Sequence, residues 1–372
     1  DVCSSDLGVT SQLTKGMVTD QARGVFQGRI VVSPGADQTD ARMGHHALIL
    51  SDKAEVDAKP ELLIFADDVS CAHGNTIGAL DEDAMARFLQ RFVDAKLGIY
   101  LASAGSGESH AMTRAEIKRV YEIGVSLAKG KIQVNAKPPE QHTARATREQ
   151  TLLAIESGVE VVNVYGPASW HGFKPTDQEY FAYYDDVLRG IHHPIAIAPN
   201  PTIGYTPKPT AIAEVCRKYR QVAAVNLSGV DKDYFIELKD AMTRTDVELY
   251  VPFPDSFLML ELGATGMVSM EGNILPKTFR RYLDLCERRD AAGAAALYAD
   301  ISRFIRFVRK WQSSTPRWLK MAMRVLGLPG GEGGLREPYR MPPDDEVRRF
   351  AEGLRALGIA ELNEQLAAAK AI

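Results

Sequence analysis

The chain has 372 residues, of which 45% are hydrophobic and 25% are charged, and its formal net charge at pH 7 is -4. This is the composition of an ordinary globular protein, and without a basic stripe it gives no support to a nucleic-acid-binding surface. No apolar run is long enough for a membrane helix, and the scattered cysteines, with no CxxC pair, predict reduced thiols in a cytoplasmic protein.

The chain begins with DVCSSDLG, which is polar and carries no apolar signal-peptide core. One back-translation of DVCSSDL, GAC GTG TGC TCT TCC GAT CT, resembles the end of a common sequencing adapter. We therefore expect residues 1–19 to be a disordered or artefactual leader. From residue 24 to 70, short β-branched and aromatic runs are separated by Gly, Pro and Asp. This pattern predicts short stacked strands, either a β-helix or part of a sandwich.

From residue 83 onward, short apolar runs alternate with helical stretches, which indicates βα units and a parallel sheet covered on both faces. The expected strands are residues 97–105, 131–136, 159–167, 194–201, 222–229, 247–253 and 263–272. Their even spacing favours a closed barrel, and no GxGxxG follows the first of them. Since a TIM barrel has eight strands, we expect an α/β fold with a (β/α)8 TIM barrel at 81–290 that lacks its first strand. A C-terminal helical region at 291–372 should follow.

Two stretches in the N-terminal part carry a family resemblance: RGVFQGRIVV and TDARMGHHALILSDKAEVDAKPELLIFADDVSCAHGNTIGALDEDA. They resemble the C-terminal end of the β-helical core of the SufD scaffolds of iron–sulfur cluster assembly. The resemblance implies a β-helix-like fragment at 20–80 and places the residues associated with cluster assembly at Cys71 and His73. A thiolate and an imidazole suit iron, although a small buried residue and a turn residue fit the sequence equally. Because most of that scaffold is missing, we expect no cluster assembly, and contacts with Suf scaffold partners only if the fragment is functional.

Three further stretches, IYLASAGSGESHAMTRAEIKRV, GATGMVSMEGNILP and LGLPGGEGGLREPYRMPPDDEVRRF, resemble motifs of the dihydrodipicolinate synthase/N-acetylneuraminate lyase family. They correspond to its glycine-rich strand-2 motif, its eighth-strand motif and its C-terminal hinge. The resemblance covers residues 80–372 and implies a barrel aldolase. In that family a strand-6 lysine forms a Schiff base with a 2-keto acid such as pyruvate, and a Tyr after strand 4 relays protons. It also implies a homo-oligomer.

The family's site residues carry over only in part. The strand-2 motif leaves Gly105, Ser106, Gly107 and Glu108 as expected substrate-binding residues, with its usual hydroxyl pair reduced to Ser106. In VAAVNLSGV, Asn226 stands where the lysine is expected. Because Asn has no nucleophilic amine, the resemblance predicts that the lysine mechanism is lost at this position.

The proton relay and a substitute amine are less well defined. In VYGPASWHGFKP, Ser169 falls near the expected Tyr position and Tyr165 lies a few residues earlier. Lys137, Lys174 and Lys232 are candidate substitute amines. Each of them also fits an ordinary solvated loop lysine.

Polar residues at the ends of the predicted strands suggest a site without reference to any family, because the C-terminal ends of barrel strands converge on one face. Glu140, His142 and His171 could ligate a divalent metal, or His171 could act as a general acid–base beside Trp170. Alternatively these are solvated loop residues. The converging set is Glu108, His110, Glu140, His142, His171, Asn200, Asn226, Asp255 and Glu271.

The family resemblance, together with these residues, implies a lyase- or aldolase-like barrel that binds a small oxo- or hydroxy-carboxylate and has no established cofactor. We expect catalytic roles for His171, Tyr165 and Asn226, and further substrate contacts from Asn200 and Glu271. The alternatives are an iron–sulfur assembly scaffold fragment and a catalytically inactive ligand-binding barrel.

The two resemblances meet at LDEDA, residues 80–84. An acidic stretch of this kind ends the scaffold segment and also suits the start of a helix. We therefore expect that residues 1–80 and 81–372 were not selected together.

Overall fold

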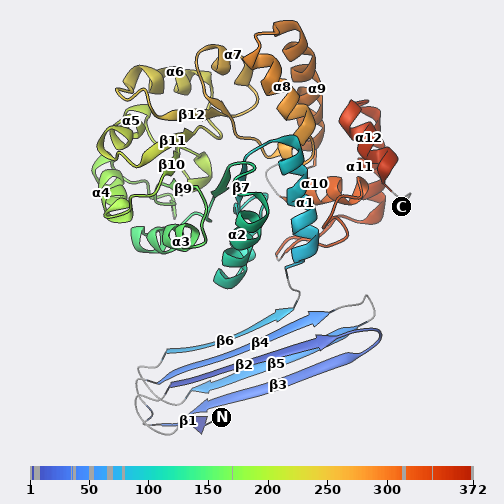
Figure 1. Ribbon diagram of the computed structural model, residues 1–372. Coiled ribbons are helices and arrows are strands. Elements are labelled where there is room, and N and C mark those ends of the chain that lie inside the picture. Colours follow the sequence, from blue (N-terminus) through green and yellow to red (C-terminus); the bar gives the residue numbers. More distant parts are fainter. Residues whose placement is uncertain are drawn as a thin grey trace. The chain divides into compact units, whose positions relative to one another are not determined.

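The computed structural model (Figure 1) describes residues 2–3, 9–34, 36, 39–49, 54–64, 70–77, 80–169, 171–311, 316–336 and 338–369. The chain divides into two compact units, Asp1–Asp81 and Glu82–Ile372, here called the N-terminal unit and the barrel unit. The boundary between them falls inside the LDEDA stretch.

The N-terminal unit consists of parallel strands that alternate along the chain between two three-stranded sheets. One sheet holds β1 (Val2–Cys3), β3 (Arg23–Val32) and β5 (Glu55–Ile64), and the other holds β2 (Val9–Val18), β4 (Asp40–Ile49) and β6 (Ser70–Ile77). Strand β2 lies in the segment expected to be a disordered leader, yet it pairs with β4 from Val9↔Asp40 to Val18↔Ile49. Among the described residues of this unit, alternate side chains of β3 and β4 form a small core with Ala36 of the loop between them: Ile30, Val32, Ala36, Ala41 and Met43.

The barrel unit contains a seven-stranded parallel sheet whose strand order follows the chain. Each strand lies inside a run predicted from the sequence, so the seven predicted strands are confirmed. They are β7 (Ile99–Leu101), β8 (Val134–Ala136), β9 (Val161–Tyr165), β10 (Ile195–Ala198), β11 (Val222–Asn226), β12 (Glu248–Val251) and β13 (Gly266–Met267). Within the described residues, β7 pairs only with β8 and β13 only with β12, so the sheet is not closed into a ring.

Helices cover the outer face of this sheet: α1 (Glu82–Ala95), α2 (Arg114–Ala128), α3 (Ala144–Glu156), α4 (Asp177–Leu188), α5 (Pro209–Lys218), α6 (Lys232–Ala241), α7 (Ser256–Glu261) and α8 (Pro276–Glu287). Helix α1 contacts both α2 and α8, the helices that follow the two edge strands. Arg119 of α2 pairs with Glu82 of α1 through two hydrogen bonds of 2.7 and 2.6 Å. Arg91 of α1 donates to the carbonyls of Asn273 and Ile274, just before α8. The helix layer therefore continues across the position where the strand layer is interrupted.

Four further helices follow: α9 (Ala291–Arg309), α10 (Pro316–Val325), α11 (Asp344–Ala356) and α12 (Ala360–Ala368). They pack with α8 around large, fully buried side chains that include Phe304, Trp318 and Phe350. The buried carboxylate of Glu361 in α12 accepts hydrogen bonds from the N–H groups of Lys277 and Thr278, at the start of α8. No helix in the described part of the chain has the length and apolarity of a membrane span.

Candidate functional site

Five polar side chains from the strands of the barrel unit form the base of the site: Tyr100, Asn135, Asn163, Tyr165 and Asn226. On each strand they alternate with apolar residues such as Val134, Val162 and Val225, all of which are fully buried. Because side chains alternate across a strand, the polar set occupies the face opposite to these apolar residues. Branched apolar side chains usually fill the interior of such barrels, so this polar layer needs a specific explanation.

The amides of Asn163 and Asn226 join β9 and β11. Asn226 Nδ2 donates to Asn163 Oδ1 over 2.7 Å, and the two residues are 0% and 1% exposed, respectively. Burial raises the pKa of Tyr100 to about 12, an effect that hydrogen bonding to Asn226 offsets in part. The Tyr100 hydroxyl therefore stays protonated at neutral pH, and the centre of the site is uncharged.

Tyr165 lies at the end of β9 between a cation and a carboxylate. Burial raises its pKa, the ammonium of Lys137 opposes this rise, and Glu140 adds to it. Lys137 Nζ lies 5.6 Å from the centroid of the Tyr165 ring, and the backbone N–H of Lys137 donates to the Leu101 carbonyl over 2.8 Å. Asn200, after β10, also interacts with the Tyr165 hydroxyl.

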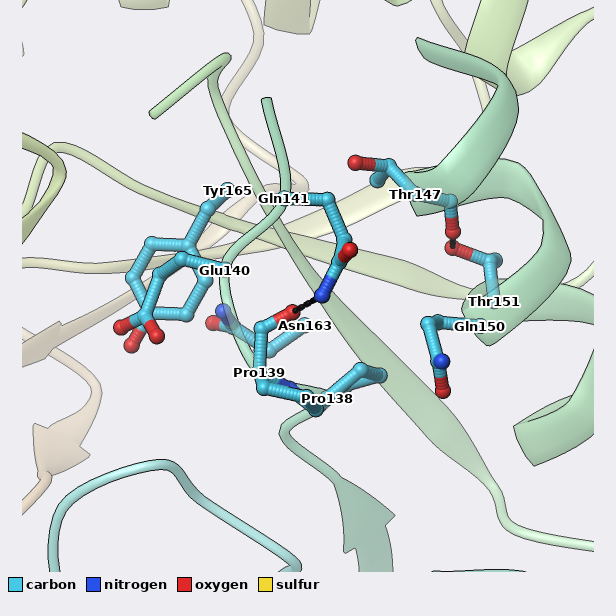
Figure 2. A pocket seen from close by; sticks show the side chains of 9 residues that line it. All are labelled: Pro138, Pro139, Glu140, Gln141, Thr147, Gln150, Thr151, Asn163 and Tyr165. Atoms are coloured by element: carbon cyan, nitrogen blue, oxygen red, sulfur yellow. Dashed lines mark hydrogen bonds between the residues drawn. The ribbon is translucent and has the colours of Figure 1, made fainter. Parts of the chain in front are cut away.

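A small hollow opens between the loop after β8 and the first turns of α3 (Figure 2). Tyr165 and Asn163 reach it from β9. The residues that line it are Pro138, Pro139, Glu140, Gln141, Thr147, Gln150, Thr151, Asn163 and Tyr165. Its lining therefore combines polar strand residues with residues of the loop and of α3.

The glycine-rich loop after β7 is held by its own hydroxyl groups. Ser103 Oγ and Ser106 Oγ lie 2.9 Å apart, and the N–H of Gly107 donates to Ser103 Oγ over 3.1 Å. A Cβ at position 107 would lie 2.8 Å from the backbone N and O of Ser103, so only glycine fits there. Ser103 provides a second hydroxyl that motif matching missed. At Gly105, by contrast, a Cβ would have no neighbour within 4 Å.

Glu108 ends this loop in the left-handed backbone conformation, with φ of 53°, and is 6% exposed. Its Oε1 accepts a 2.8 Å hydrogen bond from the N–H of Arg336, and its Oε2 lies 3.7 Å from Lys320 Nζ. The carboxylate expected to contact substrate therefore has partners in the C-terminal segment of the chain. Arg336 also pairs with Glu116 over 2.6 Å, which attaches the same segment to α2.

Glu108→Ala is expected to lower the free energy of unfolding of the barrel unit by about 2 kcal/mol, because a partly buried N–H and a partly buried ammonium lose their acceptor. Urea denaturation followed by far-UV circular dichroism measures this change. The control is Glu122→Ala, which removes an exposed carboxylate near Lys118 and Arg119 and should change stability by only about 0.5 kcal/mol. Equal effects of the two substitutions would refute the structural role of Glu108.

The residues suggested as metal ligands do not form a metal centre. No group of three or more His, Cys, Asp or Glu side chains in the described part of the chain is arranged to hold a metal ion. His142 is exposed, with Nδ1 3.0 Å from the Ala168 carbonyl oxygen. His171 is also exposed, in a turn with φ of 52°, and Trp170, expected to wall off its pocket, lies outside the described residues.

The candidate lysines differ in their surroundings. Lys232 forms a 2.6 Å ion pair with Asp233, which raises the pKa of its ammonium, and Lys174 is exposed. Lys137 is the lysine that lies beside Tyr165. The Lys137 side chain also hydrogen-bonds that of Tyr165, so its positive charge lies at the end of β9.

The remaining predicted residues have local roles in the backbone. Asn200 Oδ1 accepts from the N–H of Thr202 over 3.0 Å, at the start of a short 3-10 helix. Glu271 Oε2 accepts from Ser269 Oγ over 2.7 Å. Both lie in loops that follow barrel strands, consistent with a position around the mouth of the site.

Comparison with protein families places this geometry in context. The model of the dihydrodipicolinate synthetase family matches residues 71–356, most of the chain. The chain belongs to the dihydrodipicolinate synthetase family. The 4-hydroxy-tetrahydrodipicolinate synthase of Methanococcus maripaludis strain C5 is 24% identical over 288 residues, which cover 76% of this chain and 94% of that protein. Among solved structures, YagE, a prophage protein of the same family from E. coli K12 in complex with pyruvate, superimposes with a TM-score of 0.68 at 18% identity. That alignment covers 76% of this chain and 94% of YagE and establishes the shared fold.

The N-terminal part of this family member matches a second model, the SUF system FeS cluster assembly SufBD core domain, over residues 5–94. The iron–sulfur cluster assembly protein SufD of Escherichia coli K12 is 47% identical over 72 residues, which are 19% of this chain and 17% of SufD. The chain thus spans under a fifth of that relative, and it joins a SufBD core segment to a dihydrodipicolinate synthetase family domain. Both resemblances drawn from the motifs are confirmed. The two matched ranges overlap at 71–94, around LDEDA.

Cys71 and His73 belong to this SufBD core segment. They lie on β6, where their Cα atoms are opposite those of Ala41 and Met43 of β4. Their side chains lie outside the described residues, so their proposed link to cluster chemistry stays a prediction.

Proposed function

We propose that the barrel unit binds a small oxo- or hydroxy-carboxylate at the C-terminal ends of its strands and acts as a carbon–carbon or carbon–oxygen lyase without the lysine mechanism. The observation that carries this proposal is Asn226. It ends β11, at the position that resembles the family's Schiff-base lysine, and it is fully buried and hydrogen-bonded to Asn163. An amide cannot form an imine, but it can hold an oxygen atom of the substrate by hydrogen bonds.

The groups needed to bind a carboxylate come from the loops that follow the neighbouring strands β7 and β8. The loop after β7 supplies the hydroxyls of Ser103 and Ser106 and the main chain near Gly107. Lys137 supplies a positive charge at the end of β8. Hydrogen bonds between a cation and a carboxylate are stronger than neutral ones. A carboxylate ligand also agrees with YagE, a family member solved with pyruvate bound.

Proton transfer in this proposal is assigned to Tyr165 rather than to the exposed His171. Tyr165 is 5% exposed, and the nearby Lys137 partly counteracts the effect of burial on its pKa. A hydroxyl whose pKa is raised by burial stays protonated and can donate its proton, and the ammonium favours the resulting phenolate. Asn200 orients the same hydroxyl.

Borohydride trapping tests the loss of the lysine mechanism. Incubation with pyruvate and sodium borohydride should leave Lys137, Lys174 and Lys232 unmodified in peptide mass spectrometry. Asn226→Lys, which places an amine at the strand end, is the positive control and should gain an adduct. An adduct on any lysine of the unsubstituted protein would overturn the proposal.

The second candidate function, a barrel that binds ligand without turnover, has the same residues and needs a separate measurement. Release of a 2-oxo acid from a series of 4-hydroxy-2-oxo acids, followed with a coupled dehydrogenase, measures lyase activity directly. Calorimetric binding of these acids without release favours the inactive barrel. If the acids neither bind nor release a 2-oxo acid, both candidate functions are refuted.

We further propose a cytoplasmic homo-oligomer, as the family resemblance suggests, and no cluster assembly by the SufBD core segment alone. Light scattering measures the oligomeric state, and iron–sulfur reconstitution followed by visible absorption tests the segment.

The expectation that the two segments were not selected together is tested by amplification across codons 80–84 from source DNA. A robust product would show that the junction exists in a gene.

A further inference from the structure

The pair of amides from Asn163 and Asn226 is the most deeply buried polar group of the site. Only one hydrogen bond, of 2.7 Å, joins them. Three amide atoms in this layer have no hydrogen-bond partner among the described residues: Asn163 Nδ2, Asn226 Oδ1 and Asn135 Oδ1. Buried polar atoms are rarely left unpaired, and these three share one layer of strand residues, which makes this layer the candidate for ligand contacts.

The unpaired atoms define which ligand group fits. Turning both amides of the pair by 180° exchanges donor and acceptor but still leaves one N–H and one carbonyl oxygen unpaired. A hydroxyl group both donates and accepts, whereas an oxo oxygen or a carboxylate oxygen only accepts. An oxo group would satisfy the amide N–H and leave the amide oxygen buried without a donor.

The surroundings of the pair agree with an uncharged hydroxyl. Asn163 also lines the small hollow beside α3 (Figure 2), so one member of the pair lies at a hollow of the site. Tyr100, next to Asn226, is a neutral hydroxyl at neutral pH, and burial raises its pKa further, to about 12. The charged groups, Lys137 and Glu140, lie around Tyr165, closer to the loop after β8. Lys137 thus offers a cation to a carboxylate beside Tyr165, whereas the groups at the amide pair are neutral.

We propose that the Asn163–Asn226 pair binds the hydroxyl group of a small 2-hydroxycarboxylate, and that the barrel unit prefers this ligand to the corresponding 2-oxo acid. This inference rests on the proposed function, since it places the carboxylate at the same strand ends. It narrows the substrate class from oxo- or hydroxy-carboxylates to hydroxy-carboxylates.

Isothermal titration of the full chain with matched ligand pairs tests this preference. Lactate, as each enantiomer, is compared with pyruvate, and glycerate with hydroxypyruvate. The hydroxy acid of each pair should bind at least about tenfold more tightly, because the oxo acid leaves a buried acceptor unpaired. Equal or reversed affinities overturn this inference and leave the proposed function standing. If none of these acids binds, both are overturned.

A third ligand and one variant identify the group that is responsible. 2-Methoxypropionate keeps the ether oxygen as an acceptor and lacks the donor, so it should bind at least about tenfold more weakly than lactate. Asn226→Leu should bring the lactate-to-pyruvate ratio close to one. If 2-methoxypropionate binds as tightly as lactate, the hydroxyl hydrogen is not recognised and the inference fails, whether or not the variant folds.

Discussion

Trp318→Ala is expected to lower the free energy of unfolding of the barrel unit by about 3–5 kcal/mol, the range for large aromatic side chains removed from a core. Trp318 is fully buried in α10, and its ring meets that of Phe304 edge to face at 5.9 Å between centroids. It lies in the core that α8 shares with the C-terminal helices. Alanine would leave a cavity between these helices, and backbone helix geometry prevents them from closing it fully.

Urea denaturation of the full chain followed by far-UV circular dichroism measures this loss. The matched control is Phe173→Ala, which removes an aromatic side chain that is 78% exposed and should change stability by only about 0.5 kcal/mol. If Trp318→Ala costs under about 1 kcal/mol, the C-terminal helices do not form a continuous core with the barrel, and our description of this region is wrong.

Arg244→Met is expected to destabilise the barrel unit by about 3 kcal/mol, because it removes the side-chain donor to three partly buried main-chain carbonyl oxygens. Arg244 Nη1 donates to the carbonyls of Cys216, Tyr219 and Val222 over 2.9, 3.2 and 3.1 Å. Its side chain is 9% exposed and also pairs with Asp246 over 2.7 Å. This single guanidinium therefore joins the end of α5 to the start of β11, the strand that carries the buried amide of the site.

Two other substitutions separate this role from charge alone. Arg217→Met removes an exposed guanidinium paired with Glu214 and should cost about 0.5 kcal/mol, as surface ion pairs do. Arg244→Lys keeps the charge but loses the planar set of donors, so its effect should lie between the two. Thermal denaturation ranks the three variants, and equal effects of Arg244→Met and Arg217→Met would contradict the proposed contacts.

The strands of the barrel unit could be predicted from the sequence because their signals are local. Short apolar runs mark β7 to β13, and Thr113 followed three residues later by Glu116 forms the capping box that begins α2. Strand β2 was missed because its stretch VTSQLTKGMV is largely polar, and its apolar Leu13 and Met17 are exposed rather than buried. Its conformation depends on pairing with β4, which no short window contains.

The site could be predicted only in outline, because its contacts join distant parts of the chain. The loss of the lysine at Asn226 follows from one position, but its hydrogen bond to Asn163 spans 63 residues. The hydrogen bond from the N–H of Arg336 to the carboxylate of Glu108 spans 228 residues. The exposure of His171 depends on how its loop folds back, and residue type alone suggested a catalytic group.

The interrupted strand layer also changes how the barrel is held in shape. In a closed barrel, a continuous ring of main-chain hydrogen bonds keeps neighbouring strands from separating. Here, within the described residues, this ring is interrupted, because β7 and β13 are not hydrogen-bonded to each other. Helix α1 provides the connection across this interruption. It packs on α2 and α8, and its Arg91 donates two hydrogen bonds to main-chain carbonyls just before α8. Resistance to splaying therefore depends on side chains of a single helix, whereas a closed barrel distributes it over all its strands.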